Sequence, residues 1–344
     1  MIFSSDNWAG ASAPVSEALT RHASGLVPAY GSDPLTEAVS RRFSEIFERD
    51  VAVFFVATGT AANALALSAY ARPGGVVFSH SGAHIQVDEC GAPEFFTGGG
   101  KLRGLAGANG KITPEALSAA MADHPDGNPM HGQVSAVSIS QATECGTVYR
   151  SGEIRALADA AHGRGIPLHM DGARFANAVS FLGLTPAEVT WKAGVDVLSF
   201  GATKNGCWCA EAVVFFNSDN ALQFPYLRKR AGHLLSKSRF AAAQFDGYLA
   251  DGHWLANAAH ANGLAQTIGE GLVATGYRLA WPVEANEVFP VLPHNVIARL
   301  RAAGAMFYEW PADSIGAEES AVRLVTSFAT DPADVARFLE LAAG

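Results

Sequence analysis

Short runs of β-branched and aromatic residues alternate with alanine-rich stretches along the chain as far as Asn217. We expect strands at 51–56, 75–79, 134–140, 167–170, 195–200 and 212–216, and helices at 61–71 and 153–164. Thr113-Pro114 predicts a further helix start, and Thr185 and Glu188 have the spacing of a capping box. This alternation predicts a mostly parallel sheet with helices on both faces, whose ligands bind at the carboxyl ends of the strands.

The pattern changes after Asn217, where it becomes helical to about Thr275. Shorter strand candidates then follow at 288–292, 305–310 and 321–327, mixed with two helices. The last helix opens at Asp331-Pro332. We therefore expect an N-terminal arm (1–27), a large domain (28–245) and a smaller C-terminal α+β domain (246–344).

The composition limits the classes of partner. Among 344 residues, 49% are hydrophobic and 17% charged, which allows a large buried core, and the formal net charge is −9. So acidic a chain is a poor match for nucleic acid or an anionic membrane, and no apolar run approaches the ~18 residues of a membrane span. The first residues lack the features of a signal peptide, and four cysteines make no disulfide framework. We expect a cytoplasmic protein with a small-molecule substrate, no nucleic acid and no membrane partner.

Two charged residues follow apolar strand candidates at the predicted binding edge of the sheet. Lys204 is the only lysine placed directly after such a strand. A partly desolvated lysine can lose its proton and form a Schiff base with a carbonyl, whereas a solvated loop lysine would have no such role. Asp171 ends the strand 167–170. It can keep the pyridine nitrogen of pyridoxal phosphate protonated, or it can cap the helix that follows.

Three other features are weaker signals taken singly. Small residues at Thr58-Gly59-Thr60, between a strand and a helix, are typical of a phosphate-binding turn or of an ordinary turn. His84 can stack on an aromatic cofactor, or bind a metal with His80 and Asp88, although a metal is the less favoured of the two. Cys207-Trp208-Cys209 is poor evidence for zinc without a second cysteine pair, so we expect no metal site.

Two basic features have opposing interpretations. Arg323 alternates with apolar neighbours on a predicted strand, where its guanidinium can bind a carboxylate in a cleft or protect an exposed sheet edge. The run 228–230 is the only dense basic segment, and such runs are usually a solvated helix face.

Taken together, these segments resemble the low-specificity L-threonine aldolases, pyridoxal phosphate enzymes with the aspartate aminotransferase fold, fold type I. The matching stretches are Ser5-Asp6, Thr58-Gly59-Thr60-Ala61-Ala62-Asn63, Ala83-His84-Ile85, His169-Met170-Asp171-Gly172-Ala173-Arg174, Ser199-Phe200-Gly201-Ala202-Thr203-Lys204-Asn205-Gly206 and Val322-Arg323-Leu324-Val325-Thr326. The resemblance implies an α/β large domain with a sheet of the seven-stranded type, and a homotetramer built from homodimers with shared active sites.

The resemblance also implies roles for individual residues. Lys204 would hold the cofactor as a Schiff base, Asp171 would bind the pyridine nitrogen, and His84 would stack on the ring. Gly59 and Thr60 would bind the cofactor phosphate. The substrate carboxylate would be bound by Ser5, Arg174 and Arg323, and Arg174 would also contact the cofactor. Lys229 or Arg230 would reach the phosphate bound in the neighbouring subunit.

The implied activity is the cleavage of L-threonine, L-allo-threonine or related aryl serines to glycine and an aldehyde, a reaction of threonine catabolism. One segment departs from the family, because Gln141-Ala142-Thr143-Glu144 stands where many members have Glu-Asn-Thr-His. A second active-site histidine is therefore absent, and we expect His84 to help move the β-hydroxyl proton. A β-eliminating lyase or aminotransferase on the same scaffold, or a non-catalytic α/β binding protein, remain alternatives.

Overall fold

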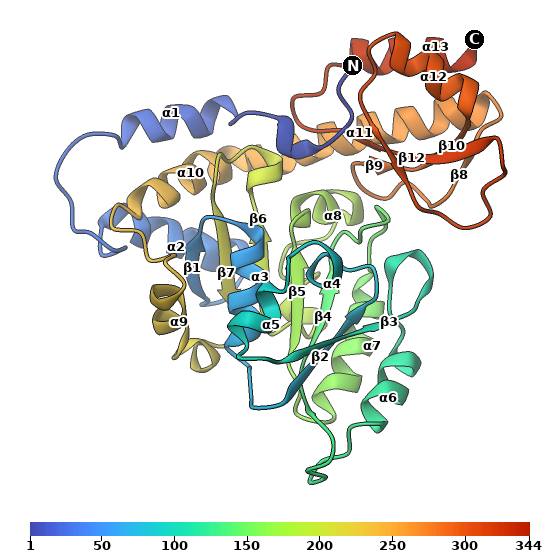
Figure 1. Ribbon diagram of the computed structural model, residues 1–344. Helices are drawn as coiled ribbons and strands as arrows, with labels where there is room; N and C mark the ends of the chain where they lie inside the picture. Colours follow the sequence, from blue (N-terminus) through green and yellow to red (C-terminus); the bar gives the residue numbers. More distant parts are fainter.

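The computed structural model describes residues 1–344 and contains two sheets (Figure 1). The large sheet has the strand order β1-β7-β6-β5-β4-β2-β3. Its strands are β1 (Ala52–Val56), β2 (Gly75–His80), β3 (Lys101–Leu105), β4 (Gln133–Ser140), β5 (Leu168–Gly172), β6 (Val197–Gly201) and β7 (Glu211–Phe215). Strands β3, β2, β4, β5 and β6 are parallel neighbours, and β7 is antiparallel to both β6 and β1. The predicted mostly parallel sheet of seven strands is confirmed.

Helices cover both faces of the large sheet and extend beyond it (Figure 1). The longer ones are α1 (Ala13–Arg21), α2 (Pro34–Ile46), α3 (Gly59–Ser68), α6 (Pro114–Ala122), α7 (Ser151–His162), α8 (Phe175–Leu182), α10 (Arg239–Leu249), α11 (His253–Ala274), α12 (His294–Ala302) and α13 (Pro332–Ala343). The shorter ones are α4 (His84–Val87), α5 (Ala92–Phe96) and α9 (Phe224–Arg230). Strands β5, β6 and β7 are buried along their whole length, which explains why they appear in the sequence as continuous apolar runs.

The second sheet is small and antiparallel, and it has its own hydrophobic core with α11, α12 and α13. Its strands are β8 (Arg278–Leu279), β9 (Glu287–Val288), β10 (Pro290–Pro293), β11 (Tyr308–Trp310) and β12 (Glu319–Val325). The first residues of the chain join this core, since Phe3 packs edge-on against Phe338. The expected α+β composition of the C-terminal part is confirmed, and the domain boundary at residue 246 stays a prediction.

Two local expectations differ from the structure. The capping box forms, with Thr185 N donating to Glu188 Oε2 at 2.8 Å and Glu188 N donating to Thr185 Oγ1 at 3.3 Å. It closes an irregular turn and starts no α-helix, so these bonds need no helix to form. Strand β3 is not expected from the sequence, because it is a short edge strand that contains Lys101 and Arg103.

None of the helices combines the length and the apolar character that a transmembrane span requires.

Candidate active site

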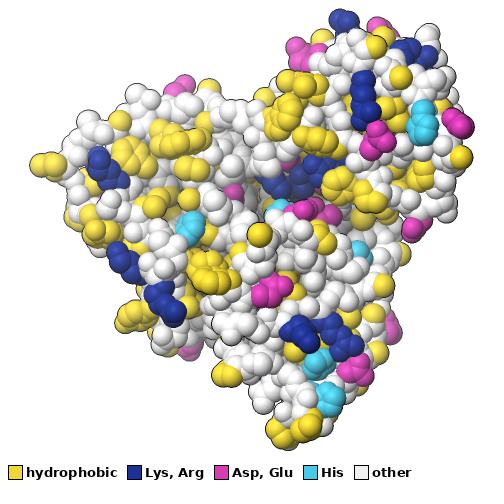
Figure 2. Space-filling model, viewed as in Figure 1, with side chains coloured by type: hydrophobic (Ala, Val, Ile, Leu, Met, Phe, Trp, Pro, Cys, Tyr) yellow, Lys and Arg dark blue, Asp and Glu magenta, His cyan; other side chains and the backbone are white.

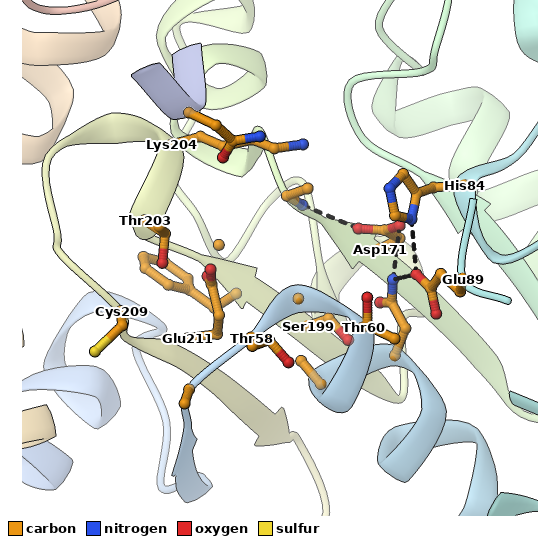
Figure 3. A pocket seen from close by; sticks show the side chains of 18 of the residues that line it. Thr58, Thr60, His84, Glu89, Asp171, Ser199, Thr203, Lys204, Cys209 and Glu211 are labelled. Atoms are coloured by element: carbon orange, nitrogen blue, oxygen red, sulfur yellow. Dashed lines mark hydrogen bonds and ion pairs between the residues drawn. The ribbon is translucent and has the colours of Figure 1, made fainter. Parts of the chain in front are cut away.

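A cavity of about 400 Å³ opens at the carboxyl ends of the parallel strands (Figure 3). The loops after β1, β2, β5 and β6 and the first residue of β7 form its walls. Five residues that the sequence singles out line it together: Gly59, Thr60, His84, Asp171 and Lys204. Figure 2 shows basic, acidic and histidine side chains gathered at a hollow in the middle of this face.

Lys204 lies in a short 3-10 turn (Thr203–Asn205) directly after β6. Hydrogen bonds to α10 and α11 hold this turn in place, because Asn205 Nδ2 donates to Tyr248 Oη at 2.7 Å and to the carbonyl oxygen of Trp254 at 2.8 Å. The Lys204 amine is half-buried and forms no hydrogen bond or ion pair within the chain. Such an amine is available to a carbonyl compound in the cavity.

Asp171 is buried at the end of β5, and both of its carboxylate oxygens accept hydrogen bonds. Oδ1 accepts from Ala173 N at 3.0 Å, and Oδ2 accepts from Asn63 Nδ2 at 2.9 Å. The N-cap of α8 is Arg174, so the alternative that Asp171 caps this helix is wrong. A buried carboxylate that faces a cavity can hold a protonated ring nitrogen.

His84, the first residue of α4, faces Asp171 across the cavity wall (Figure 3). Its Nδ1 lies 2.9 Å from Glu89 Oε1, and the same oxygen accepts from Asn63 Nδ2 at 2.8 Å. The hydrogen bond with Glu89 raises the pKa of His84 against the opposing effect of partial burial, and the charges of Asp171 and Glu144 add to the increase. We call Asp171, Asn63, Glu89 and His84 the imidazole network.

The N-terminus of α3 also lines the cavity. Thr58 caps the helix by accepting from Ala61 N at 3.1 Å, which leaves the first N–H groups, those of Gly59 and Thr60, available to an anion. A Cβ added at Gly59 would meet no atom within 4 Å, so it would project into open space of the cavity. Glycine here keeps room for a ligand against the helix end.

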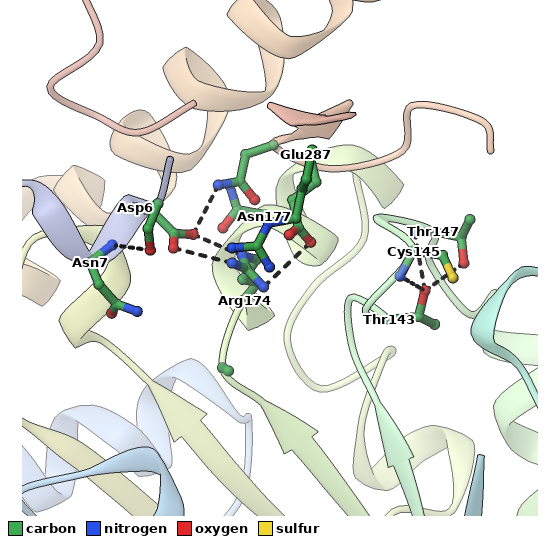
Figure 4. A network of polar contacts seen from close by, with 12 residues as sticks. Asp6, Asn7, Thr143, Cys145, Thr147, Arg174, Asn177 and Glu287 are labelled. Carbon is green, nitrogen blue, oxygen red and sulfur yellow. Dashed lines mark hydrogen bonds and ion pairs between the residues drawn. The ribbon is translucent and has the colours of Figure 1, made fainter. Parts of the chain in front are cut away.

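Arg174 lies outside the cavity in a second buried cluster (Figure 4). Its Nε and Nη2 donate to the two oxygens of Asp6 at 2.8 and 3.1 Å, and its Nη1 lies 3.3 Å from Glu287 Oε2. Asn286 Nδ2 also donates to Asp6 at 3.1 Å. We call Asp6, Arg174, Asn286 and Glu287 the arginine cluster. Because these carboxylates already engage the guanidinium, a further carboxylate would have to share Arg174 with them.

Arg323 is the guanidinium with donors to spare. Its Nη2 donates to the carbonyl oxygen of Ser4 at 3.4 Å, its Nε is buried without a partner, and its carbon lies 4.5 Å from the centre of the Trp310 ring. Strand β12 pairs with β9, β10 and β11, so the alternative that Arg323 protects an exposed sheet edge is wrong. An unpartnered donor here can bind a carboxylate.

Neither Arg323 nor the remaining predicted residues line the cavity. Ser5 Oγ accepts from Asn7 N at 3.1 Å, and Lys229 Nζ lies 5.3 Å from the centre of the Tyr30 ring. Arg230 lies in the last turn of α9. No group of three or more metal-binding side chains is present, and both ring nitrogens of His80 contact backbone atoms instead.

Three buried polar residues near the cavity have functional positions that sequence reasoning missed: Asn63, Glu89 and Glu211. Asn63 is the one polar residue in the apolar stretch 61–67, and this signal could have marked it. Glu211 lines the cavity and accepts from Ala202 N at 2.7 Å, and its burial raises its pKa to about 7. Glu89 follows no strand directly, and no local pattern indicates that it is buried.

Comparisons with known proteins identify the family of the chain. A family model described as beta-eliminating lyase matches residues 3–294. The chain is 46% identical over 308 residues to the low specificity L-threonine aldolase of Pseudomonas sp. strain NCIMB 10558, covering 89% of this chain and 88% of that protein. It is 45% identical over 342 residues to the enzyme of the same name from Pseudomonas aeruginosa, covering 99% and 95%. A solved Leishmania major threonine aldolase superposes with a TM-score of 0.93 at 30% identity, covering 99% of this chain and 98% of that one.

Proposed function

The chain belongs to the beta-eliminating lyase family, and on that premise we propose that it cleaves β-hydroxy-α-amino acids to glycine and an aldehyde. L-threonine, L-allo-threonine and aryl serines are the proposed substrates. The observation that carries the proposal is a free Lys204 amine and a buried Asp171 carboxylate in one cavity, with a capped helix N-terminus between β1 and α3. The fold and the family together support a role in amino-acid metabolism, with threonine catabolism as the proposed direction.

The chain is a lyase and pyridoxal phosphate is its cofactor. The residues present fit this group. Lys204 provides the amine that would hold it covalently, Asp171 would bind its ring nitrogen, and the N–H groups of Gly59 and Thr60 would bind its phosphate. When bound, pyridoxal phosphate supplies the electron sink for the electrons of the cleaved Cα–Cβ bond.

The chain's own residues would orient the substrate and move its proton. Arg323 would bind the carboxylate through its unpartnered donor, with Ser5 and Arg174 as the other proposed contacts. Asp171 would keep a positive charge on the ring nitrogen because a buried carboxylate stabilises it. His84 would lie against the ring and accept the β-hydroxyl proton at Nε2.

We also propose a homotetramer built from homodimers with shared active sites. Several large apolar side chains are exposed, among them Leu26, Trp208, Leu222 and Tyr226. Trp208 also lines the cavity, which supports a neighbouring subunit beside the site. Lys229 or Arg230 would then reach the neighbour's phosphate. A molar mass measured by light scattering tests this assembly.

All four cysteines are free, in keeping with the proposed cytoplasmic location.

The direct test is a retro-aldol assay on the three substrates with identification of the products. An aldehyde with glycine supports the proposal, whereas ammonia with a keto acid would show β-elimination instead. Borohydride reduction followed by peptide mapping should place the pyridoxyl label on Lys204. A label on another lysine, or a colourless protein without turnover, would contradict the assignment.

A further inference from the structure

Glu89 is buried beside the cavity, at the centre of the imidazole network (Figure 3). Its side chain has no solvent exposure, so its carboxyl group depends on partners within the chain. Oε1 contacts both His84 Nδ1, at 2.9 Å, and Asn63 Nδ2, at 2.8 Å, while Oε2 has no partner. A buried carboxyl with such limited support costs stability, which favours a role beyond packing.

The contacts define which nitrogen of His84 carries the proton in the neutral ring. As a carboxylate, Glu89 can only accept hydrogen bonds, so its Oε1 accepts from the Asn63 amide and from His84 Nδ1. A hydrogen therefore lies on Nδ1. In the neutral ring, Nε2 is then left with a free lone pair. His84 lines the cavity, and this nitrogen is available to a substrate there.

Asn63 connects the same arrangement to Asp171. Its single amide nitrogen has two hydrogens, one for Glu89 Oε1 and one for Asp171 Oδ2. Two carboxylates near the ring are thus held by one amide, and neither can turn without losing a bond. The network fixes the imidazole and the ring-binding carboxylate relative to each other.

We propose that Glu89 is the positioning residue that makes His84 the proton acceptor in carbon–carbon cleavage. The inference rests on the proposed function. The β-hydroxyl proton moves to His84 Nε2, the electron pair of the O–H bond forms the aldehyde C=O bond, and the Cα–Cβ bond breaks with its electron pair going to Cα. Cα then takes one proton from solvent to give glycine, and His84 releases the hydroxyl proton to solvent, so the protons balance and the imidazole is neutral again. Glu89 stabilises the imidazolium that the first transfer creates.

The groups that face the imidazole support this role. The Glu89 hydrogen bond raises the pKa of His84, and the charges of Asp171 and Glu144 act in the same direction. A histidine with a raised pKa is a stronger base when neutral, and a pH profile of the reaction would show its titration.

The test compares Glu89→Gln with Asp88→Asn in the cofactor-loaded protein. Asp88 is the preceding residue and is exposed, and its only bond to the network is from its backbone N–H, which the substitution keeps, so it controls for loss of a carboxylate charge. We expect Glu89→Gln to lower kcat by about tenfold or more with KM within about threefold, and to move the acid limb of the kcat–pH profile to lower pH. Asp88→Asn should change neither. An unshifted acid limb in Glu89→Gln would overturn the proposal.

A measurement without turnover gives an independent answer from the unmodified protein. Nitrogen NMR of ¹⁵N-histidine-labelled protein, with the His84 signals identified by their loss in His84→Phe, shows which ring nitrogen is protonated. We expect the neutral ring to carry its hydrogen on Nδ1, and a hydrogen on Nε2 would overturn the proposal even if Glu89→Gln failed to fold. If the parent protein lacks retro-aldol activity, the proposed function fails, whatever the NMR result. If the parent is active and His84→Phe keeps its kcat, this inference alone fails and Glu144 becomes the candidate base.

Discussion

The imidazole network and the arginine cluster are both buried and charged, but they are built from different parts of the chain. The imidazole network joins side chains of the large sheet's own loops and helices, from α3 to the end of β5. The arginine cluster joins three distant regions, because Asp6 precedes α1, Arg174 caps α8 and Glu287 begins β9 (Figure 4). The first network lies on the cavity wall, whereas Arg174 and Glu287 do not line the cavity.

This difference separates two uses of buried charge. In the imidazole network, the polar groups face a cavity, and a ligand can complete their hydrogen bonding. In the arginine cluster, the guanidinium is already neutralised by carboxylates from the N-terminal residues and the second sheet. The cluster therefore joins three regions of the chain, and a substrate carboxylate at Arg174 would share the guanidinium with Asp6 and Glu287. Substitutions in the two places should separate activity from stability.

Replacing Arg174 by Met should have the largest effect on stability. It keeps an apolar stem but leaves the carboxylates of Asp6 and Glu287 without their cation. Removing one partner of a buried ion pair costs about 3–5 kcal/mol, so we expect a loss of that order in the free energy of unfolding. Denaturant melts of the variant measure it. Arg41→Met, which removes an exposed pair with Glu37, should cost less than about 1 kcal/mol. Equal losses in the free energy of unfolding in both variants would contradict the structural role of the arginine cluster.

Replacing Asp171 by Asn should instead affect activity. An amide cannot stabilise a positive ring nitrogen as a buried carboxylate does, so the electron sink weakens. We expect the activation free energy to rise by about 3 kcal/mol, so that kcat falls more than about a hundredfold, while the cofactor still binds and the fold remains. Steady-state kinetics and cofactor absorbance measure the two effects separately. A variant that turned over like the parent would remove Asp171 from the chemistry.

The sequence predicts Asp171 and His84 of the imidazole network, and Lys204 in the same cavity, but not Asn63 or Glu89. Asp171 and Lys204 follow apolar strands directly, and the ends of parallel strands meet at one edge of a sheet. Their proximity is therefore a consequence of local pattern and fold class. The buried position of Glu89 depends on how the loop after α4 packs against α3, and no local pattern encodes that packing.

The arginine cluster shows the limit of the same approach. The family resemblance predicts ligand contacts for Arg174, and only the folded chain reveals that Asp6 and Glu287 engage it. Their long separation in sequence leaves no spacing to detect. The large sheet was predictable strand by strand, but the edge strand β3 lacks the apolar run on which the prediction relies.

Arg323 contrasts with Arg174, and its substitution should separate them. Its Nε has no partner and its Nη2 makes one hydrogen bond of 3.4 Å, so the guanidinium has donors left for a charge-assisted hydrogen bond with a substrate carboxylate. We expect Arg323→Ala to weaken substrate binding by about 2 kcal/mol, which raises KM for amino-acid substrates roughly thirtyfold, with little change in cofactor affinity. Kinetics at several substrate concentrations and a cofactor titration check this. An unchanged KM with a destabilised protein would assign Arg323 to the same structural role as Arg174.

The smallest expected effect is a pH dependence of stability that originates in Glu287. Burial raises the pKa of Glu287 from its ordinary 4.5 to about 7, although Arg174 opposes the increase. Between these values the folded chain binds a proton that the unfolded chain does not, so this stabilising contribution is lost as pH rises toward 7. Asp6 behaves in the opposite way. Burial alone would raise its pKa, but Arg174 lowers it, so its contribution is lost as pH falls.

Replacing Glu287 by Gln keeps the neutral form at every pH. We therefore expect the stability of Glu287→Gln, relative to the parent, to increase by about 1 kcal/mol between pH 6 and pH 7 and then to level off. Denaturant melts at pH 5.5, 6, 7 and 8 measure the difference. Glu318→Gln, an exposed carboxylate of the second sheet's loops, should show no such change. A difference in the free energy of unfolding that does not change with pH would mean that Glu287 is ionised at every pH tested, and that Arg174 pairs with two ionised carboxylates.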